Sequence, residues 1–103
     1  MKIIKNIEHS DNIDGVSKIT LDTFQDFRGE IWTLYSKEYC DYDFVADKIT
    51  ISRFGALRGF HGDPYTAKLI SCLSGQFQLA IVDTRGGSDT YGNVETYLIS
   101  DNE

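Results

Sequence analysis

The residues best suited to chemistry lie together in the segment 57–68, which reads L-R-G-F-H-G-D-P-Y-T-A-K. It places two cations, a titratable base and an acid close together, namely Arg58, Lys68, His61 and Asp63. Histidine changes charge near neutral pH because its unperturbed pKa is about 6.5, and lysine supplies a point charge. A run that mixes these groups with glycines and a proline makes poor core, and it is a plausible site of acid–base chemistry.

Each of these residues also has a purely structural interpretation. His61 fits a hydrogen-bonded histidine at a strand end, and Lys68 fits a solvated lysine on an edge strand. Arg58 fits an ion pair with a surface acid. Asp63 directly precedes Pro64 and fits the cap of a turn. Residue types alone leave both interpretations open.

The length and charge of the chain limit its architecture and partners. The 103 residues suffice for one domain, 1–103, and a hydrophobic content of 41% indicates a globular chain. The net charge of -6 repels nucleic acid and anionic lipid, so neither is an expected partner. A small phosphate-bearing ligand remains compatible with this charge if a few Arg and Lys side chains converge locally.

The cysteines and histidines are too few and too scattered for a metal site or a disulfide framework. Cys40 and Cys72 form no CxxC or Cys/His pattern, and His9 and His61 form no H-x-H cluster. Cys72 stands in an apolar run, so we expect a buried free thiol. The sequence shows no signal peptide and no apolar stretch long enough to cross a membrane, which predicts a cytoplasmic protein.

Short alternating and β-branched segments at intervals of about ten residues predict an all-β sandwich, jelly roll or barrel. The expected strands are 3–7, 16–21, 30–36, 47–54, 68–73, 76–83 and 94–100. Ser74 and Gly75 have the character of a two-residue hairpin connection between the fifth and sixth of these. Ser36 is a candidate N-cap for one helical turn. We expect Phe27 and Trp32 in the core.

Five motifs in order carry a family resemblance. They are F-x-D-x-R-G at 24–29, L-R-G-x-H at 57–61, K-L at 68–69 followed by Gly75, V-D-x-R at 82–85, and S-x-T-x-G at 88–92. Their order and spacing resemble the cupin-type nucleotide-sugar 3,5-epimerases, of which the dTDP-4-dehydrorhamnose 3,5-epimerases are the best known. The resemblance covers residues 16–103 and implies a jelly-roll β-sandwich.

Finer details resemble one branch of this family. F-R-G-E-I-W-T at 27–33, and R-G-F-H-G-D with T-x-K-L at 58–69, are similar to epimerases acting on GDP-4-keto-6-deoxy-heptoses in capsule synthesis. The dTDP-rhamnose branch typically has H-x-Q where this chain has H-G-D at 61–63. That branch also has asparagine near Lys48 and glutamate near Thr33. The resemblance thus leaves the nucleotide and the sugar, a hexose or a heptose, open.

The resemblance implies a reaction and assigns its catalytic residues. A base removes a proton from the carbon next to a ketone, and the carbon is reprotonated on the opposite face. His61 takes the role of the base and Lys68 stabilises the enolate oxygen. Asp83 either orients Lys68 or is a plain turn acid before Thr84. No cofactor is implied, because the ketone of the substrate acidifies the carbon.

The resemblance also assigns the contacts to the nucleotide-diphosphate sugar. Arg58 and Arg28 bind the diphosphate, and in the family the second arginine often reaches a site across a dimer. The alternative for Arg28 is a turn arginine bonded to Asp26. Asp63 could replace the glutamine as a substrate contact, and Phe24 opens the first motif as a further substrate-binding residue.

Family members are much longer than this chain, so the resemblance implies an N-terminal portion, truncated after the first six to eight strands. The absent part carries the tyrosine that acts as opposing acid, the acid paired with the histidine, and the closing strands. Open sheet edges then predict a homodimer formed by strand exchange. The alternative is a truncated, non-catalytic family member that binds sugar nucleotide or only dimerises, and a further possibility is that another polypeptide supplies the missing strands.

Overall fold

The computed structural model describes residues 4–101, and this part of the chain contains strands and no helix. The strands are β1 (Ile4–His9), β2 (Ser17–Leu21), β3 (Phe24–Asp26), β4 (Gly29–Ile31), β5 (Gln76–Val82) and β6 (Val94–Ser100). They form three two-stranded antiparallel sheets, β1-β2, β3-β4 and β5-β6. The all-β prediction is therefore confirmed, and the strand count lies in the expected range.

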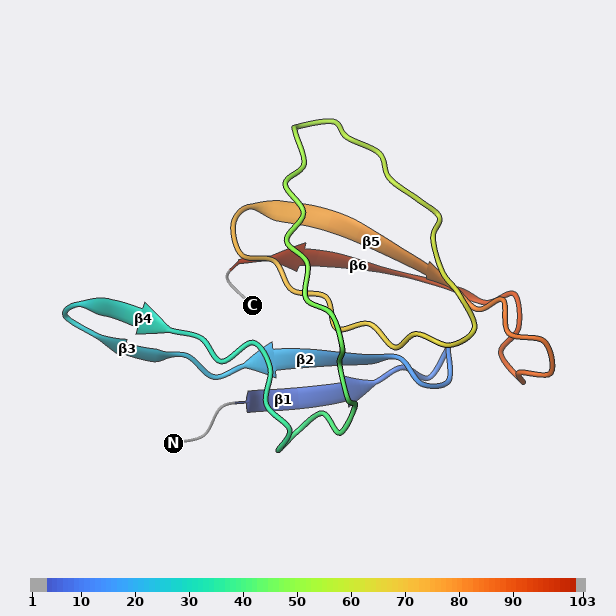
Figure 1. Ribbon diagram of the computed structural model, residues 1–103, viewed down its shortest axis with the longest axis horizontal. Helices are drawn as coiled ribbons and strands as arrows, with labels where there is room; N and C mark the ends of the chain where they lie inside the picture. The colour runs from blue at the N-terminus through green and yellow to red at the C-terminus, as the bar shows by residue number, and fades with distance from the viewer. Residues whose placement is uncertain (1–3, 102–103) are drawn as a thin grey trace.

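Two of the hairpins face each other and the third stands apart. The β5-β6 hairpin lies over the β1-β2 hairpin, while the β3-β4 hairpin extends away from both (Figure 1). Alternate side chains of a strand point to opposite faces of its sheet. Ile19 of β2, Leu79 of β5 and Tyr97 of β6 line the same hollow between the hairpins, and Leu79 and Tyr97 are paired across the ladder. The β1-β2 and β5-β6 hairpins therefore turn apolar side chains towards the same hollow.

The chain leaves much of its apolar surface uncovered. Among the described residues, Ile13 and Asp83 are the buried ones, at 2% and 3% exposure. The accessible surface is 8792 Å², against about 5,900 Å² expected for a compact monomer of 11.7 kDa. The radius of gyration is 15.1 Å, against about 13 Å for a compact chain of this length. The isolated chain therefore does not enclose a core of its own.

The middle of the chain departs from the predicted strand pattern. Residues 47–54 and 68–73 form no strand, and the strand predicted over 30–36 is limited to β4, Gly29–Ile31. An alternating pattern becomes a strand only when a neighbouring strand satisfies its backbone groups. The described part of the chain offers none there, so these predictions were wrong for the chain as it stands.

The predicted hairpin around Ser74 and Gly75 was also wrong. β5 pairs with β6 across the turn that follows Val82, and Gly75 instead precedes β5 with a φ of 89°. Its N–H donates to Asp101 Oδ2 at 3.0 Å, which fixes the start of the strand. The predicted strands 16–21, 76–83 and 94–100 correspond to β2, β5 and β6 and are confirmed.

Several local predictions can be compared directly. The turn at Ser36 is confirmed, because the Glu38 N–H donates to Ser36 Oγ at 3.2 Å. Phe27 is 97% exposed at a hairpin tip, so its placement in the core was wrong. Cys72 is half-buried rather than buried. The first predicted strand corresponds to β1, although Ile3 lies outside the described residues.

Candidate functional site

A hollow of about 230 Å³ lies between the β1-β2 and β5-β6 hairpins. Its lining comes from β2, β5, β6, the segment after β4 and the segment 68–72. The largest group of lining residues is aliphatic, namely Val16, Ile19, Leu21, Leu34, Leu69, Ile70, Leu79, Ile81 and Ile99. Sites that enclose a drug-sized ligand measure about 300–1,000 Å³, so this hollow has room for part of such a ligand.

Polar groups reach the hollow from several directions. Lys18, Lys68, Trp32, Tyr39 and Tyr97 all line it. Burial raises the pKa of the Tyr97 phenol, and a hydrogen bond with Glu95 adds to the effect. Burial likewise raises the pKa of Tyr39, whose hydroxyl donates to a backbone carbonyl. Both tyrosines therefore stay protonated at neutral pH.

The structure separates His61 from Lys68 with respect to this hollow. Lys68 is among its lining residues, whereas His61 is exposed and is not. The segment that joins them turns at Asp63, whose carboxylate accepts from the Tyr65 N–H at 2.8 Å and from Thr66 Oγ1 at 2.7 Å. The geometry around Asp63 is thus the turn cap that its place before a proline indicates.

The charge of Lys68 acts on Asp63. The hydrogen bond from Thr66 lowers the pKa of Asp63 most, the Tyr65 N–H lowers it further, and the positive charge of Lys68 makes a smaller contribution in the same direction. Asp83, which the sequence offered as a residue that orients Lys68, has no such contact with it. In the described chain the Asp83 carboxylate instead accepts hydrogen bonds within its own turn, from Arg85, Ser88 and Thr90.

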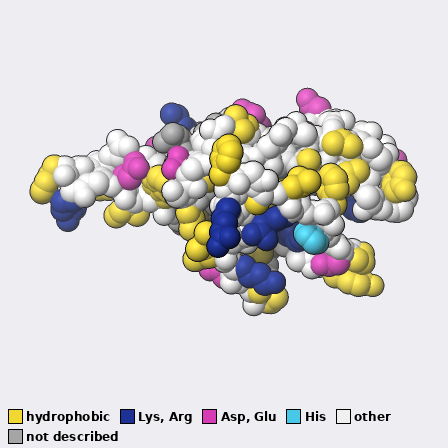
Figure 2. All heavy atoms as spheres, turned by 90° about the horizontal axis from the view of Figure 1, so that it is seen from above, with side chains coloured by type: hydrophobic (Ala, Val, Ile, Leu, Met, Phe, Trp, Pro, Cys, Tyr) yellow, Lys and Arg dark blue, Asp and Glu magenta, His cyan; other side chains and the backbone are white. Residues whose placement is uncertain are grey.

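Arg58 lies in a stretch of local positive charge. Its Nε donates to Ser52 Oγ at 2.9 Å and its Nη2 to the Ile51 carbonyl at 3.3 Å. The segment 48–62 contains three cations and no acid, although the whole chain is acidic. On the face seen from above, one histidine lies beside a group of Lys and Arg side chains (Figure 2). An anionic group meets less repulsion here than over the rest of the surface.

Arg28 and Phe24 lie on the projecting β3-β4 hairpin, away from the lining of the hollow. Arg28 Nη2 pairs with Asp26 Oδ2 at 2.6 Å, and the Arg28 N–H donates to Asp26 Oδ1 at 2.8 Å. This guanidinium holds the pKa of Asp26 below its usual value. The Arg28 side chain is still 74% exposed. Arg28 thus bonds to Asp26 within the turn between β3 and β4, and this turn is open to solvent.

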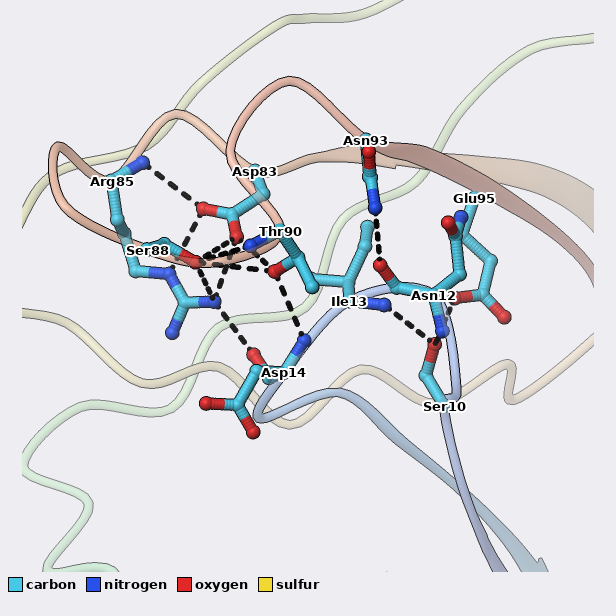
Figure 3. Close-up of polar contacts among 10 residues, drawn as sticks. All are labelled: Ser10, Asn12, Ile13, Asp14, Asp83, Arg85, Ser88, Thr90, Asn93 and Glu95. Carbon is cyan, nitrogen blue, oxygen red and sulfur yellow. Dashed lines mark hydrogen bonds and ion pairs between the residues drawn. The ribbon is translucent and has the colours of Figure 1, made fainter.

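A polar cluster around Asp83 is the most completely satisfied part of the described chain (Figure 3). The Asp83 side chain is fully buried and accepts from Arg85 Nε at 3.0 Å and from Arg85 Nη2 at 2.9 Å. The hydroxyls of Ser88 and Thr90 each donate to Asp83 Oδ2 at 2.6 Å. The hydrogen bonds from Arg85, then those from Ser88 and Thr90, hold the pKa of Asp83 well below its usual range.

The same cluster joins the turn after β1 to the turn after β5. Arg85 Nη2 donates to the Asp14 carbonyl at 2.7 Å, and the Asp14 N–H donates to Thr90 Oγ1 at 3.3 Å. Asn93 Nδ2 donates to the Asn12 carbonyl at 2.8 Å (Figure 3). These bonds fix the β1-β2 hairpin against the β5-β6 hairpin beside the hollow.

The sequence carried a signal for this cluster that its interpretation missed. Arg85, Ser88 and Thr90 belong to the motifs V-D-x-R and S-x-T-x-G, and their side chains are hydrogen-bond donors. Donor side chains two, five and seven positions after an aspartate can close a turn around its carboxylate. That spacing predicts a structural cluster without any reference to relatives.

Two further searches concern residues 4–101 only. Within that range no group of three or more His, Cys, Asp or Glu side chains is arranged to hold a metal ion. Over the same residues no helix is long and apolar enough to cross a membrane.

Comparison with known proteins identifies the family. A family profile described as dTDP-4-dehydrorhamnose 3,5-epimerase matches residues 10–103. The chain belongs to this family. The match includes all five motifs, and thus both the segment around His61 and the cluster around Asp83. The resemblance drawn from the sequence is therefore confirmed.

Curated relatives carry the same description. A dTDP-4-dehydrorhamnose 3,5-epimerase of Streptomyces griseus is 38% identical over 87 residues, which cover 76% of this chain and 44% of the relative. One from Mycobacterium tuberculosis is 37% identical over 57 residues, 52% of this chain and 28% of the relative. The chain thus spans less than half the length of these epimerases. No solved structure matches the chain.

Proposed function

We propose that this chain acts in the epimerisation of a nucleotide-linked 4-keto-6-deoxy sugar, in the synthesis of surface polysaccharides. The observation that carries the proposal is the family match over residues 10–103, which includes the segment with His61 and Lys68. The hollow lined by Lys68 supports it, because it is apolar with a few polar groups.

In this proposal His61 removes the proton from the carbon next to the ketone. The C–H bond breaks, its electron pair forms the enolate, and the negative charge on the ketone oxygen is stabilised by the Lys68 ammonium. Reprotonation of the carbon on the opposite face completes the inversion. Because His61 lies outside the hollow, activity requires the exposed segment 57–63 to turn the imidazole towards Lys68 in the working assembly.

The diphosphate would bind along the basic stretch that precedes His61. Arg58 is the proposed contact there, with Asp63 and Phe24 as further substrate-binding residues. Three cations without an acid in 48–62 support an anionic ligand on this face. Arg28 would add a second guanidinium. Its side chain is exposed at the hairpin tip and could exchange its bond to Asp26 for a bond to a phosphate oxygen.

We infer a homodimer from the uncovered surface. The excess over a compact monomer amounts to about 2,900 Å², which lies in the range buried by obligate interfaces. Isolated two-stranded hairpins are marginally stable in water, and each leaves edges that a second copy can pair. The projecting β3-β4 hairpin is placed to reach such a copy and to carry Arg28 to it (Figure 1).

The oligomeric state has a direct test. Light scattering after size exclusion at micromolar concentration should give twice the 11.7 kDa mass of one chain. A single-chain mass would refute the homodimer. A larger complex recovered only with a second polypeptide would instead support a partner that supplies the missing strands.

Deuterium exchange tests the chemistry. The protein is incubated in heavy water with a dTDP-linked and, separately, a GDP-linked 4-keto-6-deoxy sugar, and wash-in is measured by mass spectrometry. Incorporation next to the ketone should fall by about 10²- to 10⁴-fold in His61→Ala. His9→Ala is the matched control, because His9 is the other histidine and its Nδ1 contacts Ser17 Oγ at 2.8 Å in the β1-β2 hairpin.

The nucleotide that supports faster wash-in decides the branch. The curated relatives carry names that favour dTDP, whereas the H-G-D sequence at 61–63 favours GDP-heptose. No incorporation above the His61→Ala background with either nucleotide would refute catalysis by this chain.

The exposed position of His61 favours a second candidate, a non-catalytic family member that binds sugar nucleotide. Calorimetric titration with dTDP and GDP separates the two candidates. Binding without wash-in supports the second, and binding with wash-in supports the first. Absence of both leaves dimerisation as the remaining function of this chain.

A further inference from the structure

We propose that Trp32 donates a hydrogen bond to the ketone oxygen of a ligand held in the hollow between the hairpins. Among the described residues, Trp32 Nε1 is a buried side-chain polar atom without a hydrogen-bond partner. Trp32 also lines the hollow together with Lys68. An N–H group removed from water without a partner is destabilising, so such a group calls for an acceptor.

The backbone brings the indole to this position. β4 ends at Ile31, and the extended chain that follows alternates its side chains, as strands do. Trp32 and Leu34 line the hollow, whereas Ile31 and Tyr35 are 63% and 43% exposed. The indole therefore enters the hollow from the side of the projecting hairpin, and Lys68 enters from the segment before β5.

The two tyrosines of the hollow differ from Trp32 in having hydrogen-bond partners. The Tyr39 hydroxyl donates to the Leu34 carbonyl. Tyr97 is hydrogen-bonded with Glu95 and Ser10. Indole has one donor and no acceptor, so a ligand that satisfies Trp32 must present an acceptor oxygen.

The apolar lining restricts the ligand further. Aliphatic residues of β2, β5 and β6 line the same hollow as the indole, and they favour a ring with few exposed polar groups on one side. A cyclic ketone fits this description, because its carbonyl accepts from the indole while its ring packs on the aliphatic walls. An enolate oxygen gains more, since hydrogen bonds to charged acceptors are stronger than those to neutral ones. The assignment to a keto-sugar rests on the proposed function.

Nuclear magnetic resonance tests the site without any nucleotide. The chain has one tryptophan, so the indole N–H gives a single assigned cross peak in the wild-type protein. Titration with cyclohexanone should move the indole proton downfield in a saturable way, because the carbonyl accepts its hydrogen bond. Cyclopentane, which has a ring and no acceptor, should leave the peak in place. No movement with cyclohexanone, or equal movement with both compounds, would overturn the proposal.

A substitution tests the role of Trp32 towards the keto-sugar. Trp32→Phe keeps an aromatic ring and removes the N–H, so its affinity for a nucleotide-linked 4-keto-6-deoxy sugar should fall roughly tenfold. Its affinity for the free nucleotide should not change. Equal affinities of the two proteins for the keto-sugar would overturn the inference. If Trp32→Phe does not fold, the wild-type titration decides alone.

The two experiments separate this inference from the proposed function. If the indole responds to cyclohexanone but no nucleotide sugar binds, the ketone site stands and the proposed function fails. If the nucleotide sugar shows deuterium wash-in without any response of the indole or any effect of Trp32→Phe, the proposed function stands and the ketone contact is wrong.

Discussion

The turn at 83–94 and the segment at 57–68 both carry family motifs, yet they differ in how far the chain itself supports them. In the first, the Asp83 carboxylate accepts five hydrogen bonds from Arg85, Ser88 and Thr90 and is fully buried. In the second, His61 and Lys68 are exposed, and the hydrogen bonds of Asp63 close only a local turn.

The two regions thus contain two kinds of motif residue. Those around Asp83 find their hydrogen-bond partners within this chain, whereas those in 57–68 find few partners in it. The cluster around Asp83 needs only two turns of the same chain, so the isolated chain builds it. The segment 57–68 has few contacts with the rest of the chain. We therefore expect it to be among the less stable parts of the molecule, as binding loops usually are. We expect a ligand or a second copy of the chain to supply the contacts that the segment 57–68 lacks.

Amide hydrogen exchange should show the contrast most strongly. Corrected for intrinsic rates, the amides of Asp83 and Gly92, which bond to Asn93 and Asp83 carbonyls at 2.9 and 2.7 Å, should exchange at least about 100-fold more slowly than those of 57–62. Addition of the nucleotide sugar should slow exchange in 57–68 and leave exchange in 83–94 unchanged. Equal rates in the two regions would show that the segment is supported by the isolated chain.

Asp83→Asn should cause the largest loss of stability among single substitutions of an acid. The amide cannot accept all the bonds of the buried carboxylate, and it leaves the donor groups of Arg85, Ser88 and Thr90 partly unpaired. The melting temperature should fall by roughly 10 °C. Asp89→Asn is the matched control, because Asp89 is exposed in the same turn. A similar fall in both variants would mean that the effect is not specific to the cluster.

Sequence patterns correctly predicted those strands and turns whose hydrogen-bond partners lie within this chain. The alternation in 16–21, 76–83 and 94–100 produced strands because each finds an antiparallel partner in this chain. The turn at Ser36 formed because its hydroxyl lies two residues before an N–H that it can accept from.

The same patterns failed where the partner is missing. Residues 47–54 alternate as well as the confirmed strands do, but the described chain holds no strand beside them. For the site, the sequence predicted the residue types, and Lys68 does line a hollow. It could not predict that the imidazole of His61 lies outside it, because the orientation of an exposed loop depends on contacts that a motif does not encode.

Acid should weaken the cluster in a defined direction. The folded pKa of Asp83 lies well below the value of about 3.9 in an unfolded chain, because Arg85 and the two hydroxyls favour the carboxylate. Its contribution to stability is therefore present above pH 4 and is lost as the pH falls towards the folded pKa.

Urea unfolding at several pH values checks this loss. The difference in unfolding midpoint between the wild-type protein and Asp83→Asn should shrink by roughly a third between pH 7 and pH 2.5. A residual slope common to both proteins is expected from Asp26 and Asp63, whose pKa values are also lowered. A difference that stays constant over this range would contradict the linkage of Asp83 to folding.

Arg28→Ala should have the smallest effect on stability. It therefore probes a motif residue that contributes little to the fold and is proposed to act on a ligand. Its pair with Asp26 is exposed, and such pairs contribute little because water and salt screen them. The melting temperature should change by less than about 1 °C, whereas affinity for the nucleotide diphosphate should fall roughly tenfold if Arg28 reaches a bound phosphate. Lys37→Ala is the matched control, since Lys37 pairs with Asp43 at 3.4 Å on another exposed turn. A loss of stability without a loss of affinity would mean that Arg28 stabilises the fold, as the residues around Asp83 do. The contrast between the two regions would then not extend to the β3-β4 hairpin.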